Sequence, residues 1–257
     1  MAGESKARTV MVALAVCLVC SIGVSAAAVF LKPLQTANKL ADKRKNILQV
    51  VNLYEPGMDV NGQFDSLVNT RLINLESGEF VQGNDLNPAT YDMYVAAKDP
   101  AMSSAIPKSD DIARIGRKPE IATVYLVEGD AGEVKAIILP VQGYGLWGQL
   151  YGFLALEGDA RTVVGLSFYD HKETPGLGGE VDNLKWKGQW PGKLAYDAEG
   201  DVALRLIKGT VEPGAANAEY KVDGLAGATL TSNGVSNLIQ FWLSEAGYKP
   251  FLDNVRS

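Results

Sequence analysis

The residues best suited to hold a charged ligand lie between Asp223 and Gly234, where small residues and hydroxyl groups precede a predicted helix. Gly224 and Gly227 let a ligand approach the main chain, and Thr229 follows them closely. The start of a helix presents unpaired backbone N–H groups and about half a positive charge, so an anion is favoured there. The spacing predicts a phosphate site, although a glycine-rich turn with a hydroxyl helix cap has the same composition.

The helix after this loop is predicted from its apolar residues. They recur at i, i+3, i+4 and i+7, on one helical stripe: Val235, Leu238, Ile239 and Trp242. Ser232 and Asn233 are of the type that caps a helix start, so we expect the helix to begin near them. The loop therefore delivers Thr229 to a helix N-terminus.

A second segment with room for a ligand is HKETPGLGG, residues 171–179. His171 is the only histidine of the chain, and neither a Cys or Ser partner nor a further histidine suggests a catalytic triad or a metal site. A hydrogen-bonded structural role is the more usual one for such a histidine. Pro175 and Gly176 predict a turn, and the glycines leave space beside it.

A third segment, GYGLWG at residues 143–148, satisfies the pattern G-x-G-x-x-G and is followed by Asp170. The pattern alone is typical of dinucleotide-binding sites, but there a helix opens at the glycines. Residues 150–156 are instead β-like and run into a turn, so we do not predict a Rossmann site. We expect a loop between strands, in which Tyr144 and Trp147 either pack or line a flat ligand.

The first of these loops resembles the acceptor motif of proteins that carry FMN as a phosphoester on a threonine. The matching residues are Asp223, Gly224, Gly227, Ala228 and Thr229. In that motif the threonine after Gly-Ala takes the flavin, so the resemblance implies FMN covalently attached to Thr229. Ala226 departs from the motif, which usually has Ser or Thr there, and Thr231 and Ser232 remain rival hydroxyls.

The segment HKETPGLG at 171–178 is followed some fifty residues later by this acceptor motif, in the order found in the FMN-binding domain of membrane flavoproteins. Over essentially its whole length the chain resembles the C subunits of the sodium-translocating NADH:quinone oxidoreductases. The resemblance implies flavin contacts from Asp223, Gly224, Leu225, Gly227, Ala228, Thr231 and Ser232 beside Thr229, from His171, Glu173, Thr174, Gly176 and Leu177, and from Gly143, Tyr144, Gly145 and Trp147. Glu173 would either bond the polar edge of the flavin or cap a backbone turn.

The resemblance implies an electron relay, with no catalytic residue, metal site or stand-alone active site in this subunit. The complex would couple NADH oxidation by ubiquinone to sodium export. The implied partners are its other subunits, membrane lipid and a flavin transferase that attaches FMN from FAD. Two alternatives stay open: a similar subunit of the complex that couples ferredoxin and NAD, against which residues 58–118 and GYGLWG argue, and a flavin-free membrane-anchored scaffold.

An apolar segment of 23 residues, 9–31, lies near the N-terminus and contains no charged residue. As a helix it is roughly 35 Å long, enough to cross a bilayer. The rival interpretation is a cleaved signal peptide, because Lys6 and Arg8 precede the segment and small residues stand at 26–28. We favour a retained span because the segment is longer than the usual core of a signal peptide.

The only cysteines, Cys17 and Cys20, lie inside this span. Two ligands cannot complete a tetrahedral metal site, and no histidine lies near them. We expect both to be packing residues, and the absence of cysteine elsewhere in the sequence excludes a disulfide in the globular part.

Charge is unevenly distributed along the chain. Residues 1–46 carry seven Lys or Arg against two acidic residues, a net charge of +5, and the remaining 211 residues carry 17 against 28, a net charge of −11. An acidic domain is poorly suited to nucleic acid, so we expect no such partner. Lysines follow the span, and the positive-inside rule taken literally places the domain in the cytoplasm. The resemblance implies the opposite: a bacterial inner membrane, a cytoplasmic N-terminus (1–8) and a periplasmic FMN domain.

Two segments, 121–141 and 150–170, each contain two β-rich runs joined by a short turn, at Gly129–Gly132 and at Gly158–Asp159. Such pairs predict hairpins. Helical patterns lie mostly before and after them, so the fold class is α+β, with an antiparallel sheet and flanking helices.

The predicted organisation around these hairpins has three parts. A stalk helix and linker occupy 32–57, with Pro33 in a first helical turn, where proline is tolerated. Residues 58–118 combine loops, short helices and a few strands. The soluble domain is 58–257, with an FMN-binding core at about 119–250.

Overall fold

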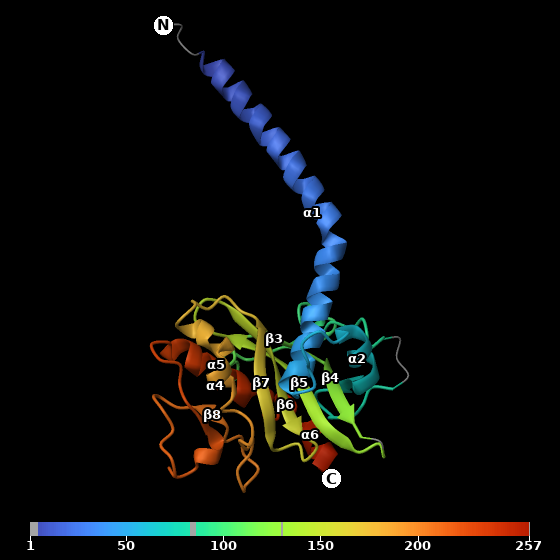
Figure 1. Ribbon diagram of the computed structural model, residues 1–257, viewed down its shortest axis with the longest axis vertical. Coiled ribbons are helices and arrows are strands. Elements are labelled where there is room, and N and C mark those ends of the chain that lie inside the picture. Colours follow the sequence, from blue (N-terminus) through green and yellow to red (C-terminus); the bar gives the residue numbers. More distant parts are fainter. Residues whose placement is uncertain (1–4, 83–85, 130, 257) are drawn as a thin grey trace. The chain divides into compact units, whose positions relative to one another are not determined.

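The computed structural model describes residues 5–82, 86–129 and 131–256. The chain divides into two compact units, Met1–Lys43 and Arg44–Ser257. The first unit is formed by most of α1 (Lys6–Val50), a single helix of 45 residues that is blue in Figure 1. This helix is long and apolar enough to cross a membrane, and its most apolar stretch is not buried against any part of the chain that the structure describes.

Pro33 lies inside α1, so its predicted place in the first turn of a separate stalk helix is wrong. A proline inside a helix removes one backbone hydrogen bond and disfavours the preceding turn. The residues on both sides of Pro33 propagate the helix cooperatively, and α1 runs through it to Val50. The domain boundaries given above remain predictions.

The second unit is built on a five-stranded antiparallel sheet with strand order β1-β4-β5-β6-β7 (Figure 1). Its strands are β1 (Val68–Asn74), β4 (Ile121–Glu128), β5 (Val134–Tyr144), β6 (Gln149–Glu157) and β7 (Val163–Asp170). Successive strands from β4 to β7 pair with one another, which confirms the two predicted hairpins. Gly143 and Tyr144 of GYGLWG end β5, and residues 145–148 form the connection to β6, which is the expected loop between strands. Asp130 of the predicted first turn lies outside the described residues, as do residues 1–4 of the predicted cytoplasmic segment.

Shorter elements surround the sheet. In the chain, α2 (Val60–Leu67) precedes β1, whereas α3 (Met93–Ala96), β2 (Ser103–Ala105) and β3 (Arg117–Pro119) lie between β1 and β4, as expected for residues 58–118. After β7 come the 3-10 helix η1 (Gly178–Asp182), α4 (Leu184–Lys187), β8 (Arg205–Leu206), the 3-10 helix η2 (Ala218–Tyr220), β9 (Lys221–Val222), α5 (Thr229–Trp242) and α6 (Lys249–Arg256). The strands β8 and β9 form a separate parallel pair. The α+β class is confirmed.

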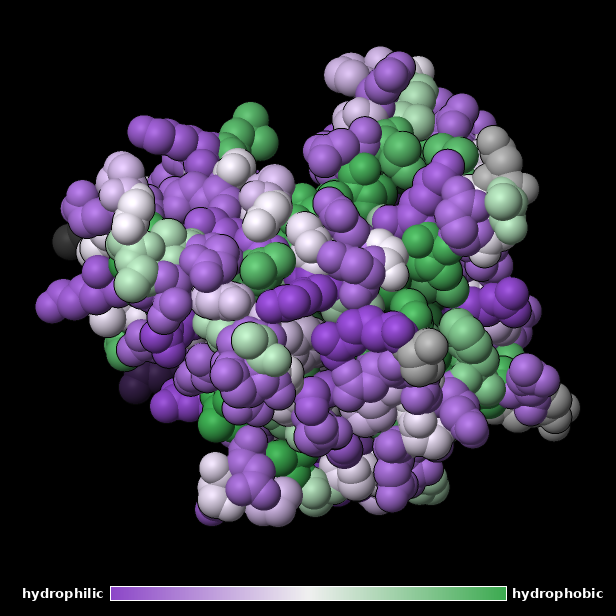
Figure 2. Space-filling view, turned by 90° about the horizontal axis from the view of Figure 1, so that it is seen from below, coloured by the Kyte–Doolittle hydropathy of each residue, from purple (hydrophilic) through white to green (hydrophobic). Residues whose placement is uncertain are grey.

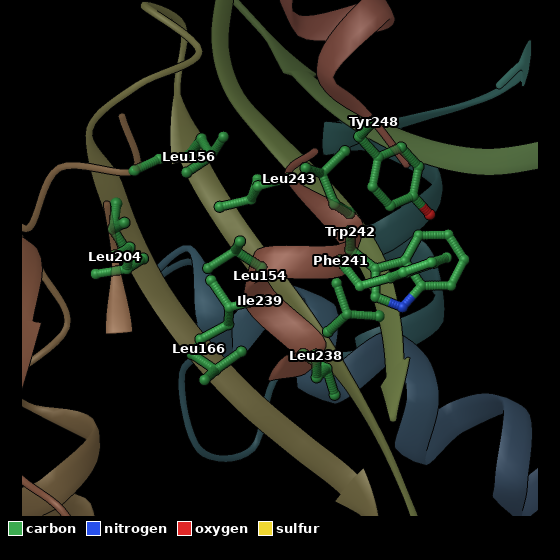
Figure 3. Close-up of a cluster of buried hydrophobic side chains, with 14 of the residues drawn as sticks. Leu154, Leu156, Leu166, Leu204, Leu238, Ile239, Phe241, Trp242, Leu243 and Tyr248 are labelled. Carbon is green, nitrogen blue, oxygen red and sulfur yellow. The ribbon is translucent and has the colours of Figure 1, made fainter. Parts of the chain in front are cut away.

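One face of the sheet packs against α5. The predicted stripe of this helix is fully buried, and Figure 3 shows Ile239 beside Leu154 and Leu166 of the sheet and Trp242 near Tyr248. The indole Nε1 of Trp242 donates a hydrogen bond of 2.7 Å to the carbonyl of Gln142 on β5. The helix is therefore fixed to the sheet by apolar packing and by a buried polar contact.

The other face of the sheet packs against the last turns of α1 and against α2. Ile47, Leu48 and Val50 join Phe64 in a second buried cluster with side chains of β4, β5 and β6. Because both faces of the sheet are covered, its central strands read as continuous apolar runs and not as alternating patterns.

The start of α5 differs from the prediction. The helix begins at Thr229, three residues before Ser232, and Ala228 occupies the N-cap position without a side-chain hydrogen bond. Ser232 lies inside the first turn, where its hydroxyl donates to the carbonyl of Ala228 at 3.1 Å and accepts from the amide of Leu225 at 2.9 Å. Its polar side chain stabilises the helix start from within, which the pattern of cap residues does not distinguish from a cap.

Candidate functional site

The site is built around the first residue of α5. Thr229 is exposed, and so are Ala226 and Gly227 in the loop before it. Gly227 has a φ of +73°, the left-handed region that favours glycine, so the loop can turn tightly into the helix. Since Ala228 supplies no capping side chain, the first N–H groups of α5 are left for other acceptors.

The two rival hydroxyls have partners inside the protein. Thr231 is fully buried and donates to Oε2 of Glu173 at 2.5 Å. Ser232 is also buried and makes the two backbone hydrogen bonds described above. Of the three hydroxyl side chains predicted at this helix start, Thr229 alone is exposed.

Thr229 borders a cavity of about 360 Å³. One wall comes from the end of β8 and the loop after it, residues 206–210, and the other from residues 224–227 and the first turn of α5. The amide of Gly224 donates to the carbonyl of Gly209 at 3.0 Å, which holds the two walls together. Lys208 and Thr210 line this cavity, and sequence reasoning missed both of them.

Glu173 joins the three predicted segments. Its carboxylate Oε1 accepts from the backbone amides of Leu146 and Trp147, each at 3.0 Å. The other oxygen accepts from the hydroxyl of Thr231 on α5. Glu173 is only 6% exposed, so a buried carboxylate has three hydrogen-bond donors from two other segments. This confirms the expectation that Glu173 caps a backbone turn.

Two glycines make room for this carboxylate. A Cβ at Gly145 would lie 2.6 Å from Oε1 of Glu173, and a Cβ at Gly178 would lie 2.5 Å from Oε2. Gly227 faces Leu177, since a Cβ there would lie 3.1 Å from the Cδ2 of that leucine. The loop 171–179 therefore contacts both the GYGLWG loop and the loop before Thr229.

His171 is held on both sides of its ring. Its Nδ1 accepts from the backbone amide of Glu173 at 3.2 Å, and its Nε2 lies 2.8 Å from Oδ2 of Asp182. The hydrogen bond to Asp182 raises the pKa of His171, while partial burial opposes this rise. Asp182 also pairs with Lys187 at 3.5 Å. His171 is the hydrogen-bonded structural residue expected of a lone histidine.

The other predicted contact residues have mixed positions. Tyr144, Trp147 and Leu177 are exposed beside the Glu173 contact, and so are Thr174 and Gly176. Gly143 is instead buried, and a Cβ there would lie 2.8 Å from Cβ of Leu238 on α5. It makes room for the helix.

Asp223 also has a structural contact. Its Oδ1 accepts from the amide of Val211 at 2.7 Å, and its carbonyl accepts from the indole of Trp186 at 2.9 Å. These bonds hold the loop before Thr229 against residues that precede it in the chain. No sequence signal pointed to Asp182, Lys208 or Val211 as neighbours of the site, because only the folded chain brings them there.

The comparisons with known proteins agree with this geometry. Residues 145–244 match the model of the FMN-binding domain family. This range contains the GYGLWG segment from Gly145 onward and the whole of the other two segments. The chain is 56% identical over 256 residues to the C subunit of the Na(+)-translocating NADH-quinone reductase of Pseudomonas aeruginosa, covering 98% of this chain and 97% of that one. It belongs to the family of these C subunits.

Further members of the family show the same extent of similarity. The C subunit from Yersinia pestis is 46% identical over 98% of this chain and 94% of its own. The crystal structure of Shewanella oneidensis NqrC is 33% identical, covers 86% of this chain and 99% of that chain, and superposes with a TM-score of 0.78. Matches of this length favour the C-subunit family over the ferredoxin-linked complex considered from the sequence.

Proposed function

We propose that this C subunit relays electrons through an FMN that is covalently attached to Thr229 by a phosphoester, within a sodium-translocating NADH:ubiquinone oxidoreductase. The observation that carries the proposal is the exposure of Thr229. Its hydroxyl group belongs to an exposed residue at the start of α5 and lies beside a cavity. The residue also lies within the region that matches an FMN-binding domain. Thr231 and Ser232 are buried and hydrogen-bonded, so attachment to either would disrupt the helix start.

The chain's residues suit such a cofactor in three ways. The uncapped N–H groups of α5 favour a phosphate on Thr229. The cavity beside Thr229, lined by Lys208, would hold the group next to the phosphate. Exposed apolar side chains, Tyr144, Trp147 and Leu177, lie around the Glu173 contact and would pack against a flat ring.

The attached group supplies electron transfer, and the protein supplies attachment and orientation. Both oxygens of Glu173 are already hydrogen-bonded within the chain, so its role here is to hold the segments that face the ring. A covalent bond prevents the cofactor from diffusing away between transfers, which suits a relay without its own substrate site.

The proposed setting is the inner membrane of a bacterium, with α1 as the single span, the N-terminus in the cytoplasm and the flavin domain in the periplasm. The resemblance noted from the sequence implies this orientation, whereas the lysines after the span argue against it. Membership of a multisubunit reductase supports contacts with the other subunits, which can set the orientation. Lipid around α1 and a flavin transferase during maturation complete the proposed partners.

The test is flavin fluorescence after denaturing electrophoresis, with the chain produced beside a flavin transferase. Wild type should give a fluorescent band, and Thr229→Val should give none because its side chain has no oxygen to esterify. Thr210→Val is the matched control, since Thr210 is exposed and lines the same cavity. A band that persists in Thr229→Val, or that disappears in Thr210→Val, contradicts the proposal.

A further inference from the structure

The contacts of His171 define which of its ring nitrogens carries the proton. A backbone amide can only donate, so the bond from the Glu173 amide requires a lone pair on Nδ1. A carboxylate only accepts, so the 2.8 Å contact with Asp182 requires the proton on Nε2. The geometry is therefore that of the neutral imidazole with its proton on Nε2.

Protonation of this ring removes one of the two bonds. In the imidazolium both nitrogens carry hydrogen, and Nδ1–H would point at the N–H of Glu173. The bond to Asp182 is kept and becomes an ion pair. The side chain of His171 is 14% exposed, so water has little access to replace the lost acceptor.

The residue that loses this bond is Glu173, which connects the three segments of the site. Glu173 bonds the amides of Leu146 and Trp147 in the GYGLWG loop and the hydroxyl of Thr231 on α5. A shift of its backbone is transmitted to these contacts because the carboxylate fits between Gly145 and Gly178 without spare room.

We propose that His171 is a positioning residue of the flavin site: in its neutral form it holds the backbone of Glu173, and its protonation releases Glu173 and loosens the three segments around Thr229. The presence of a flavin at this site rests on the proposed function. The loosening of the three segments rests only on the hydrogen bonds of His171 and Glu173.

The charged groups around His171 favour its protonated form. Asp182 of η1, Glu173 and Asp170 at the end of β7 all favour the imidazolium, and Asp182 has the largest effect on the raised pKa. Lys187 of α4 neutralises part of the charge of Asp182. Loss of the Glu173 bond and partial burial oppose protonation, but the bond to Asp182 outweighs burial and keeps the pKa of His171 above its ordinary value.

Because the chain has one histidine, its ring can be observed directly. The full-length chain, purified in detergent through a tag without histidine, is labelled with ¹⁵N-histidine for the ring and with ¹⁵N in its backbone for the amides. We expect the Nε2–H tautomer at about pH 8. On acidification the amides of Glu173, Leu146 and Trp147 should shift with the same midpoint as the imidazole. An Nδ1–H tautomer, or titration of the ring without these amide shifts, overturns the proposal.

The same measurement on Thr229→Val separates this inference from the proposed function. The variant has no acceptor hydroxyl for flavin, and the hydrogen bonds of His171 do not involve residue 229. If the flavin proposal fails, the tautomer and the amide shifts still test the role of His171.

A second experiment uses the flavin of the loaded full-length chain, whose fluorescence polarisation is followed from about pH 8 to about pH 5. Wild type should lose polarisation in a one-proton transition. Asp182→Asn should move the midpoint to lower pH because it removes the charge that favours protonation. Glu180→Gln is the matched control: Glu180 is an acid of the same 3-10 helix that bonds Asn183 and not His171, so the midpoint should stay in place.

His171→Gln should abolish the transition, since glutamine does not titrate. A wild-type profile without a transition, or an equal transition in His171→Gln, overturns the proposal. Should His171→Gln fold poorly, the tautomer measurement on the wild-type ring still decides.

Discussion

Three hydroxyl side chains lie within four residues at the start of α5, and burial distinguishes them. The hydroxyl groups of Thr231 and Ser232 form hydrogen bonds inside the protein, whereas Thr229 is exposed beside a cavity. Breaking the hydrogen bond of a buried hydroxyl group costs free energy, because its partner is left unsatisfied. Neighbouring hydroxyl residues therefore have different roles: Thr229 is available for attachment of the cofactor, whereas Thr231 and Ser232 stabilise the helix start.

The supporting role of Thr231 predicts a loss of stability. Thr231→Val leaves one oxygen of the buried Glu173 without its donor, which costs about 1–3 kcal/mol of unfolding free energy. Thr231→Ser keeps the hydroxyl and should cost less. Urea unfolding of the two variants measures the difference, and equal stability of Thr231→Val and wild type would count against a structural role for this bond.

The pair of His171 and Asp182 predicts a pH dependence of stability. Asp182 raises the pKa of His171 above its unfolded value, so this contribution is present at low pH and is lost as pH rises through the folded pKa. For Asp182, partial burial is outweighed by the bonds from His171 and Lys187, which hold its pKa below the ordinary value. Its contribution is present above the unfolded pKa and is lost as pH falls through the folded one.

Asp182→Asn should therefore cost more stability at about pH 5.5 than at about pH 8.5. The side chain of Asp182 is 52% exposed, so solvent limits the difference to about 1 kcal/mol or less. Chemical unfolding at the two pH values measures it. A cost that is equal at both, or larger at the higher pH, contradicts the ion pair.

At the element scale, the site is an intersection of three connections that the sheet and α5 hold in place. The hairpin tip between β5 and β6 approaches the first turns of α5, where a Cβ at Gly234 would collide with the backbone carbonyl of Tyr144. The loop after β7 inserts Glu173 between them. The apolar stripe of α5, buried against the sheet, fixes the position of the helix for both contacts (Figure 3).

Gly234→Ala tests this approach of helix and hairpin. On an isolated helix alanine would be about 1 kcal/mol more favourable than glycine. Here we expect destabilisation instead, by about 1–3 kcal/mol, because backbone atoms must move. Asn237→Ala, one turn further along α5, is the control and should be nearly neutral. Thermal unfolding measures both, and stabilisation by Gly234→Ala would refute the close approach.

Much of this arrangement was predictable from local patterns. The hairpins follow from β-rich runs with short glycine turns, and the buried stripe of α5 from its spacing. The helix start was misplaced because a serine that bonds backward to Ala228 has the composition of a cap. The bond between Glu173 and Thr231 joins residues 58 positions apart, and no local pattern encodes such a contact. Lys208 and Asp182 were missed for the same reason.

At the scale of the whole molecule, an apolar helix and an acidic domain occupy one chain. The face of the molecule in Figure 2 is mostly hydrophilic, with hydrophobic side chains in small separate groups. The exposed large hydrophobic side chains of α1 contrast with this, since many stand in succession between Val10 and Leu40. Such a surface is stable in lipid and not in water.

The retained span predicts the mass of the mature chain. If α1 anchors the domain, the protein extracted from membranes should contain residues 1–43, and a chain shortened to residues 44–257 should appear in the soluble fraction with an unchanged unfolding temperature. Intact-mass measurement and fractionation test this. A mature chain that begins after residues 26–28 would show that the segment is a cleaved signal peptide.

The central claim is that Thr229 carries the flavin, and the most direct measurement is mass spectrometry of the peptide that contains it. The chain should be produced with a flavin transferase and digested, and the peptide fragmented to assign the modified residue. We predict the added mass of an FMN phosphoester on Thr229, with Thr231 and Ser232 unmodified. An unmodified Thr229, or FMN on either buried hydroxyl, would contradict this account of the site.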